Sequence, residues 1–174
     1  MAGIKDKPRG KDLAAEIGKK RPFEHAEEEA YLNLLRTTSM LSWQFEQLFK
    51  AHGLSEATYN VLRILRGAGT GGGGGRSCSE IGEDMVTRVP DVTRLVDRLE
   101  EAGLVERCRV PEDRRVVRVK ITGKGLGVLT SLDKPGLKLI KAQLGHMSRS
   151  ELAELSRLLV KARAGEGMKE LGTE

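Results

Sequence analysis

The sequence predicts a mainly α-helical fold with one small β-hairpin, flanked by long terminal helices. Across most of the chain, apolar residues recur at steps of three and four, the period of a helix with one buried face. Two runs, 104–110 and 116–122, instead alternate between apolar and polar residues, as half-buried strands do. Capping residues and glycines separate these segments. The 174 residues suit a single domain, expected at 23–163.

The two ends of the chain carry no helical or strand period. Residues 1–22 mix Lys, Arg, Gly and two prolines and are expected to form a flexible basic tail. Residues 164–174 are expected to form a frayed C-terminal tail.

The first long helix is expected at about 27–51, because its apolar residues fall on one stripe and three glutamates load its first turn. Gly53 is expected to end it, and a second helix follows at about 56–67. The glycine run at 71–75 is then a loop. It is not a phosphate-binding loop, because Gly75 is followed by Arg76 without the required lysine.

A short helix is announced by Ser77 and Glu80, whose spacing suits a capping box. The next helix is predicted at 90–102, with Pro90 in its first turn, an apolar face on one side and Gly103 as its stop.

The alternating runs that follow predict an antiparallel hairpin. In the first run, Leu104, Cys108 and Val110 are placed on the apolar face, with Val105, Arg107 and Arg109 on the other. In the second, Val117, Val119 and Ile121 form the apolar face. The turn between them carries Asp113, Arg114 and Arg115.

Two further helices are expected within 123–163. Thr122 suits the cap of the first, Pro135 is expected to bend it, and Ser148 with Glu151 forms a second capping box for the last helix.

The composition of the chain indicates which kinds of partner it suits. Lys and Arg outnumber Asp and Glu by 30 to 25, a net charge of +5, which mildly favours a polyanionic partner.

No apolar run is long enough to span a membrane and no secretory signal is present, so a cytoplasmic location is expected. The cysteines and histidines are scattered, and no catalytic constellation occurs at useful spacing, so we expect no metal site, no cofactor and no enzyme activity.

Two helices in close sequence followed by a basic hairpin are the parts of a winged helix-turn-helix, here expected at about 54–122. A helix fits the DNA major groove, and a two-stranded wing reaches the backbone or the minor groove. The candidate DNA-binding residues of the second helix and the turn before it are Arg88, Asp91, Thr93, Arg94 and Arg98. At the wing tip, Arg114 and Arg115 suit a narrow minor groove, and Asp113 is expected to orient an arginine.

Charge alone leaves an alternative open. Residues 86–120 hold nine cations and seven acids, an excess of two, which many solvated surfaces share. A winged-helix module that contacts proteins and does not bind DNA therefore remains the second hypothesis.

The run VTRLVDRLEEAGLVERCRVPEDRRVVRVKITGKG at 92–125 resembles the signature of the MarR family of transcriptional regulators, and LSEATYNVLRIL at 54–65 resembles the preceding helix of that family. The resemblance implies a transcriptional repressor that binds double-stranded DNA at a pseudo-palindromic operator as a homodimer. Its dimerisation helices would be 27–51 and 123–163, which carry the predicted interface residues Tyr31, Leu34, Leu35, Leu144, Leu152, Leu155 and Leu159. It also implies a small lipophilic or phenolic effector, for which Met40, Trp43, Phe45 and Tyr59 are the candidate pocket residues.

Overall fold

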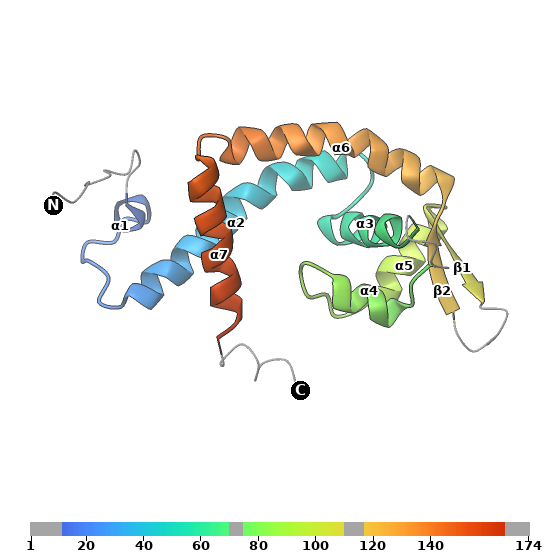
Figure 1. Ribbon diagram of the computed structural model, residues 1–174, viewed down its shortest axis with the longest axis horizontal. Coiled ribbons are helices and arrows are strands. Elements are labelled where there is room, and N and C mark those ends of the chain that lie inside the picture. The colour runs from blue at the N-terminus through green and yellow to red at the C-terminus, as the bar shows by residue number, and fades with distance from the viewer. Residues whose placement is uncertain (1–11, 70–74, 110–116, 166–174) are drawn as a thin grey trace. The chain divides into compact units, whose positions relative to one another are not determined.

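The computed structural model describes residues 12–69, 75–109 and 117–165 and divides into two compact units, residues 1–56 and 57–174 (Figure 1). The first unit contains α1 (Leu13–Glu16) and α2 (Ala26–Lys50). The second contains α3 (Glu56–Gly69), α4 (Cys78–Asp84), α5 (Val92–Glu101), β1 (Val105–Arg109), β2 (Val117–Ile121), α6 (Gly123–Leu144) and α7 (Arg149–Arg163). The predicted fold class is confirmed.

A short helix, α1, lies within the segment for which the sequence predicted an irregular tail. The carboxylate of Asp12 accepts a hydrogen bond from the backbone N–H of Ala15 at 2.8 Å and so caps this helix. Leu13 is buried, and Arg36 of α2 forms a 2.6 Å ion pair with Glu16. A short helix therefore forms in part of the segment 1–22, for which the sequence showed no helical period.

The end of α2 matches the prediction. Gly53 adopts a positive φ of 71°, a conformation that favours glycine, and the N–H of Leu54 donates to the carbonyl of Phe49 at 3.0 Å. This backbone bond closes the helix one turn after Lys50.

The core of the second unit is aliphatic. Its most deeply buried side chains come from α3, α4, α5, β2 and α6, and they are Val61, Leu62, Leu65, Ile81, Val96, Leu99, Val119, Leu129 and Leu132. Burial of branched aliphatic side chains supplies most of the stability of such a core, at about 1.5 to 3 kcal/mol for each.

The start of α5 corrects one prediction. The carboxylate of Asp91 accepts from the N–H of Arg94 at 3.0 Å, so Asp91 is the capping residue and the helix begins at Val92. The sequence predicted Pro90 in the first turn of the helix. This prediction is wrong, because Pro90 precedes the capping residue. A side-chain cap fixes where a helix starts more strongly than a proline does, since proline is also tolerated before it.

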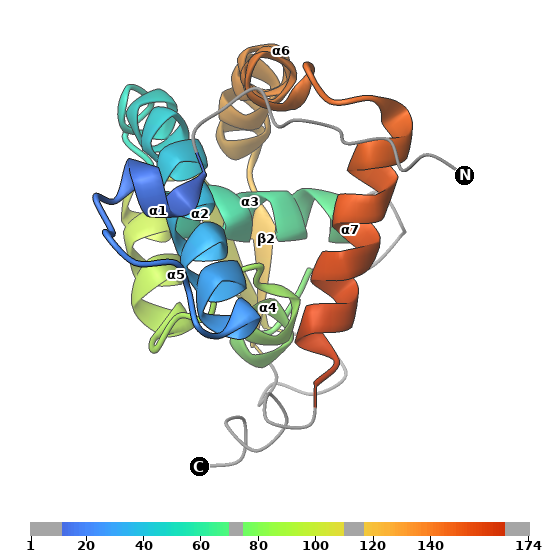
Figure 2. The same cartoon turned by 90° about the vertical axis from the view of Figure 1, so that its left-hand side faces the viewer.

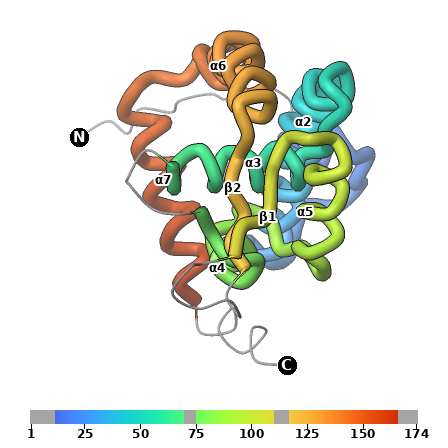
Figure 3. The backbone as a smooth tube through the Cα atoms, turned by 90° about the vertical axis from the view of Figure 1, so that its right-hand side faces the viewer, coloured from blue at the N-terminus to red at the C-terminus, as the bar shows by residue number. Residues whose placement is uncertain are grey.

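The wing is an antiparallel pair in which Val105 lies opposite Ile121 and Arg107 opposite Val119. Arg76 adds an isolated bridge to Val119, with backbone bonds of 3.0 and 2.7 Å. Figure 3 shows β1 between β2 and α5. Val105 is buried and shares its face with Arg107, whereas Cys108 lies opposite Arg118 on the other face. The prediction that Cys108 lies on the apolar face of the wing is therefore wrong.

The last two helices begin as predicted. The hydroxyl of Thr122 accepts from the N–H of Gly125 at 3.1 Å, and Ser148 and Glu151 form a capping box at α7. Pro135 lies inside α6, which continues to Leu144. After Gly145 the chain turns, and α7 runs in a different direction from α6 (Figure 2). Of the helices in the described ranges, none has the length and apolar character needed to cross a membrane.

Candidate nucleic-acid interface

Helix α5 divides its side chains between the core and solvent. Val96 and Leu99 are buried, whereas Thr93, Arg94 and Arg98 are exposed, as the sequence predicted for a DNA-reading helix. Over the described part of the chain, neither Arg94 nor Arg98 forms an ion pair. Both guanidinium groups are therefore available to an anionic partner.

The residues just before α5 are also exposed. Arg88 lies in the turn after α4, and Asp91 caps α5. Since the carboxylate of Asp91 already accepts a backbone N–H, its position at the helix start is explained by capping.

Arg107 joins the wing to α5 through two acids of that helix. Its Nη2 donates to Oδ1 of Asp97 at 2.5 Å, its Nη1 bonds to Oε2 of Glu100, and its backbone N–H donates to Oε1 of Glu100 at 3.0 Å. The hydrogen bond to Asp97 is the main cause that raises the pKa of Arg107, with Glu100 also contributing. The sequence predicted no such role, because the period of a strand does not reveal a partner on another element.

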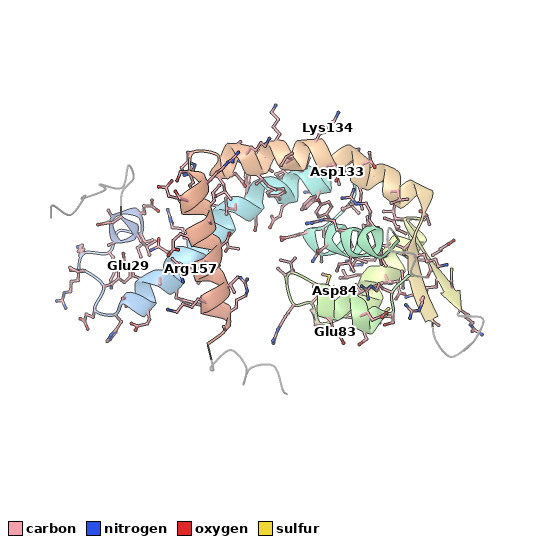
Figure 4. All side chains as sticks on the ribbon, viewed as in Figure 1. Glu29, Glu83, Asp84, Asp133, Lys134 and Arg157 are labelled. Carbon is pink, nitrogen blue, oxygen red and sulfur yellow. The ribbon has the colours of Figure 1, made fainter. Side chains whose placement is uncertain are left out.

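A second cluster of charges fastens the wing to α4. Arg118 donates to the carbonyl of Gly75 at 2.9 Å and lies 3.7 Å from a carboxylate oxygen of Glu80. Nη1 of Arg76 lies 3.7 Å from Oε1 of Glu80, and Nη2 of Arg76 lies 3.8 Å from Oδ2 of Asp84. Figure 4 labels Asp84 on α4. These contacts give Arg76 and Arg118 a structural role at the base of the wing.

The start of α6 is bonded to the turn between α5 and β1. Thr122 donates through its hydroxyl to the carbonyl of Gly103 at 2.8 Å, and Lys124 donates through Nζ to the carbonyl of Ala102 at 2.7 Å. The backbone N–H of Thr122 donates to Leu104 at 3.0 Å. These bonds satisfy carbonyls at the end of α5 and join α5, β1 and α6 at one point.

The wing tip lies outside the described residues. Asp113, Arg114 and Arg115 belong to the range 110–116, so their predicted contacts with DNA stay predictions. At the ends of the strands that lead into this range, Arg109 of β1 and Val117 of β2 are exposed.

The candidate effector residues fall in both units. In the first, Met40 and Trp43 are largely exposed, at 66% and 62%, and Phe45 is half-buried with its ring centroid 5.7 Å from that of Phe49. In the second, Tyr59 is half-buried, and the guanidinium carbon of Arg63 lies 5.9 Å from its ring centroid. Met40 and Trp43 thus present apolar surface to solvent on α2.

The candidate dimerisation residues are exposed or half-buried in the single chain. Tyr31, Leu34 and Leu35 are exposed on α2, and Leu155 is exposed on α7. Leu144, Leu152 and Leu159 are half-buried. Helix α7 buries none of its residues, although its apolar side chains repeat at helical spacing. An apolar face left open to water is typical of a surface that another chain covers.

Comparison with known proteins identifies the family. The sequence profile of the MarR family matches residues 54–117, from two residues before α3 to the first residue of β2. A solved structure of a MarR transcription factor from Planctomyces limnophilus is 40% identical, with a TM-score of 0.60, and the match covers 79% of this chain and 98% of that one. The chain belongs to the MarR family. It is therefore a DNA-binding transcriptional regulator and not an enzyme.

Two other known proteins are similar to this chain. The transcriptional repressor IacR of Pseudomonas putida is 29% identical over 126 residues, which are 72% of each chain. BpsR of Bordetella bronchiseptica, described as regulated in its DNA binding by 6-hydroxynicotinic acid, has the same fold, with a TM-score of 0.70 at 22% identity and coverage of 84% of this chain and 100% of that one.

Proposed function

We propose that this MarR-family protein is a homodimeric repressor that binds a pseudo-palindromic operator with α5 and the wing. The observation that carries the proposal is the sorting of charge on α5. Arg94 and Arg98 are exposed, while Asp97 and Glu100 are bound to Arg107. The exposed side of the helix thus carries Arg94 and Arg98, which suit guanine edges or phosphates in the major groove, with Glu101 as the exposed acid at its end.

The wing tip contributes the second contact in this proposal. Arg114 and Arg115 enter the minor groove adjacent to the major-groove contact, and Asp113 orients one of them. Arg88 and Thr93 contact the backbone near α5.

The homodimer is supported by the open apolar faces of α2 and α7. Tyr31, Leu34 and Leu35 on α2, and Leu155 on α7, expose apolar surface that a second copy would cover. Leu144, Leu152 and Leu159 complete the proposed interface. A two-fold axis then presents two α5 helices, which requires two half-sites in inverted order.

The proposed effector is a small aromatic or lipophilic molecule. The IacR relative is a repressor, and the DNA binding of the BpsR relative responds to an aromatic acid. Met40, Trp43, Phe45 and Tyr59 are the residues of this chain proposed to contact such a molecule, because aromatic and thioether side chains line most small-molecule sites.

Selection of bound duplexes from a random DNA library tests the repressor model. Recovery of an inverted repeat, with affinity that falls steeply with salt, is the expected result. Weak binding that is independent of sequence would instead favour the winged-helix module that contacts proteins. On the recovered operator, Arg94→Ala should weaken binding by about 1 to 3 kcal/mol and relax the base preference at one position of each half-site.

The matched control for Arg94→Ala is Lys134→Ala, which removes an exposed cation from α6 (Figure 4). It should change operator affinity little at any base pair. Equal losses in the two variants would contradict base recognition by Arg94.

A further inference from the structure

Arg107 occupies the contact between the wing and α5, and the DNA-contact proposal uses it only as the partner of two acids. We propose that Arg107 is a positioning residue that sets the sequence selectivity of the protein, by holding the wing at a fixed place relative to α5 without contacting DNA. This inference rests on the proposed operator binding.

The geometry of the bridge fixes both the side chain and the main chain of β1. Oε1 of Glu100 accepts the backbone N–H of Arg107 at 3.0 Å, and Oε2 of the same carboxylate accepts from the guanidinium. Asp97 accepts from the other guanidinium nitrogen at 2.5 Å. The Glu100 carboxylate thus accepts from both the main chain and the side chain of Arg107. The Asp97 carboxylate holds the other end of the guanidinium and prevents the Arg107 side chain from rotating.

The residue type matters because the two acceptors are separate groups. Asp97 and Glu100 are three residues apart on α5 and therefore share one flank of the helix. A guanidinium presents its donors in a rigid planar fork that can reach both acids at once, whereas a lysine ammonium is a compact charge on a flexible stem. A lysine at position 107 would keep the charge and lose the fixed orientation.

The bridge is placed at the centre of the wing. Arg107 lies opposite Val119, which is fully buried, and Val119 also exchanges backbone bonds with Arg76 on its other side. The wing is therefore attached to α5 by Arg107 on one edge and to the segment before α4 by Arg76 on the other. Figure 3 shows β1 on the side of the wing next to α5. Loss of the Arg107 bridge would remove the side-chain link between the middle of β1 and α5, while the bonds of Arg76, Arg118 and Thr122 remain.

The same bridge controls the charge that α5 shows to DNA. Arg94 is three residues before Asp97, a spacing at which opposite charges on a helix meet. The Asp97 carboxylate accepts a hydrogen bond from Arg107 of the wing and is therefore bound to Arg107, not to Arg94. A freed Asp97 would compete with DNA for Arg94.

Simple electrostatics and positioning make opposite predictions for the double variant Asp97→Asn, Glu100→Gln. The double variant is more positive by two charges, so electrostatics alone predicts tighter binding to every duplex. Positioning predicts that the operator, recovered by selection with the wild-type protein, is bound about 10-fold more weakly. A random duplex of the same length is bound equally or more tightly, so the ratio of the two affinities falls by at least about 10-fold.

Three further variants separate orientation from charge. Arg107→Gln and Arg107→Lys should both lower the affinity ratio, although Lys keeps the charge. Lys134→Gln on α6 removes one cation away from the wing and should leave the ratio unchanged (Figure 4). Urea unfolding and size-exclusion chromatography of each variant identify any loss of folding or assembly. Should the double variant fail to fold, Asp97→Asn alone retains both bonds to Glu100 and is used in its place.

The outcomes distinguish the two proposals. A wild-type protein with no operator preference overturns the proposed function itself. A wild-type protein that prefers its operator, together with a folded double variant that binds both duplexes more tightly by the same factor, overturns the role of Arg107. A fall in the affinity ratio in the double variant and in Arg107→Lys, but not in Lys134→Gln, supports it.

Discussion

Replacing Gly125 with Ala tests the joint at which α6 meets the turn between α5 and β1. Gly125 is buried in the first turn of α6, and a Cβ added there would lie 2.8 Å from Cγ1 of Ile121 and closer still to the carbonyl oxygen of Leu104. Contacts under 3.0 Å essentially never occur for a real Cβ. The carbonyl belongs to the backbone and accepts from Thr122, so it cannot move aside by a change of rotamer.

Two terms of opposite sign decide the magnitude. Alanine is favoured over glycine inside a helix by about 1 kcal/mol. Overpacking costs about 1 to 3 kcal/mol, and a clash with backbone falls at the upper end of that range. The expected net loss is about 2 kcal/mol, which for a chain of this size lowers the melting temperature by roughly 4 to 8 °C.

Gly127 provides the matched control, since it lies two residues later in the same helix with nothing within 4 Å of an added Cβ. Gly127→Ala should therefore stabilise the protein by up to about 1 kcal/mol. Thermal and urea unfolding at one fixed protein concentration measure both variants, because dimerisation makes stability depend on concentration. If Gly125→Ala proves as stable as Gly127→Ala, the close approach of α6 to Leu104 is refuted.

Two further predictions concern ion pairs and pH. Arg66 of α3 donates to both carboxylate oxygens of Asp133 of α6, at 2.9 and 3.0 Å. A double-mutant cycle with Arg66→Gln and Asp133→Asn, measured by urea unfolding, should therefore give a coupling free energy of about 0.5 to 1 kcal/mol. Zero coupling would contradict the pairing. The pKa of Glu80 is lowered from 4.5, first by the backbone N–H of Ser77 and then by its hydroxyl, so its contribution to stability is present above pH 4.5 and is lost as the pH falls through the lowered value. Unfolding measured against pH should therefore show a shallower acid slope for Glu80→Gln than for the wild type, and identical slopes would contradict this assignment.

The sequence predicted the features whose causes are local. The capping boxes that begin at Ser77 and Ser148 were found because the capping serine and its glutamate are three residues apart in the chain. Gly53 and Gly103 both have positive φ and follow the ends of helices, as their sequence context predicted. In each case the interacting groups lie within one helical turn, so sequence spacing alone determines the geometry.

The features that sequence could not predict depend on contacts between distant elements. Alternation in β1 gave two faces but could not say which one was buried, and Cys108 was assigned to the wrong one. Val105 and Arg107 share the face that holds the buried Val119, and α5 supplies the two acids that bind Arg107 there. From the sequence alone, an arginine in a strand is expected to face solvent. The partners that hold Arg107 on the inner face are acids of α5, which strand alternation cannot reveal.

The same limit explains why net charge was a weak guide to the DNA interface. Residues 86–120 hold only two more cations than acids, which by itself does not distinguish a DNA-binding surface from an ordinary solvated one. Asp97 and Glu100 face the wing strand, where Arg107 binds them, and Glu80 lies near Arg118. An ion pair contributes little field beyond its own neighbourhood, whereas an exposed, unpaired arginine acts over about a Debye length, roughly 8 to 10 Å. The placement of each acid, and not the total charge, therefore determines how positive the exposed side of α5 is.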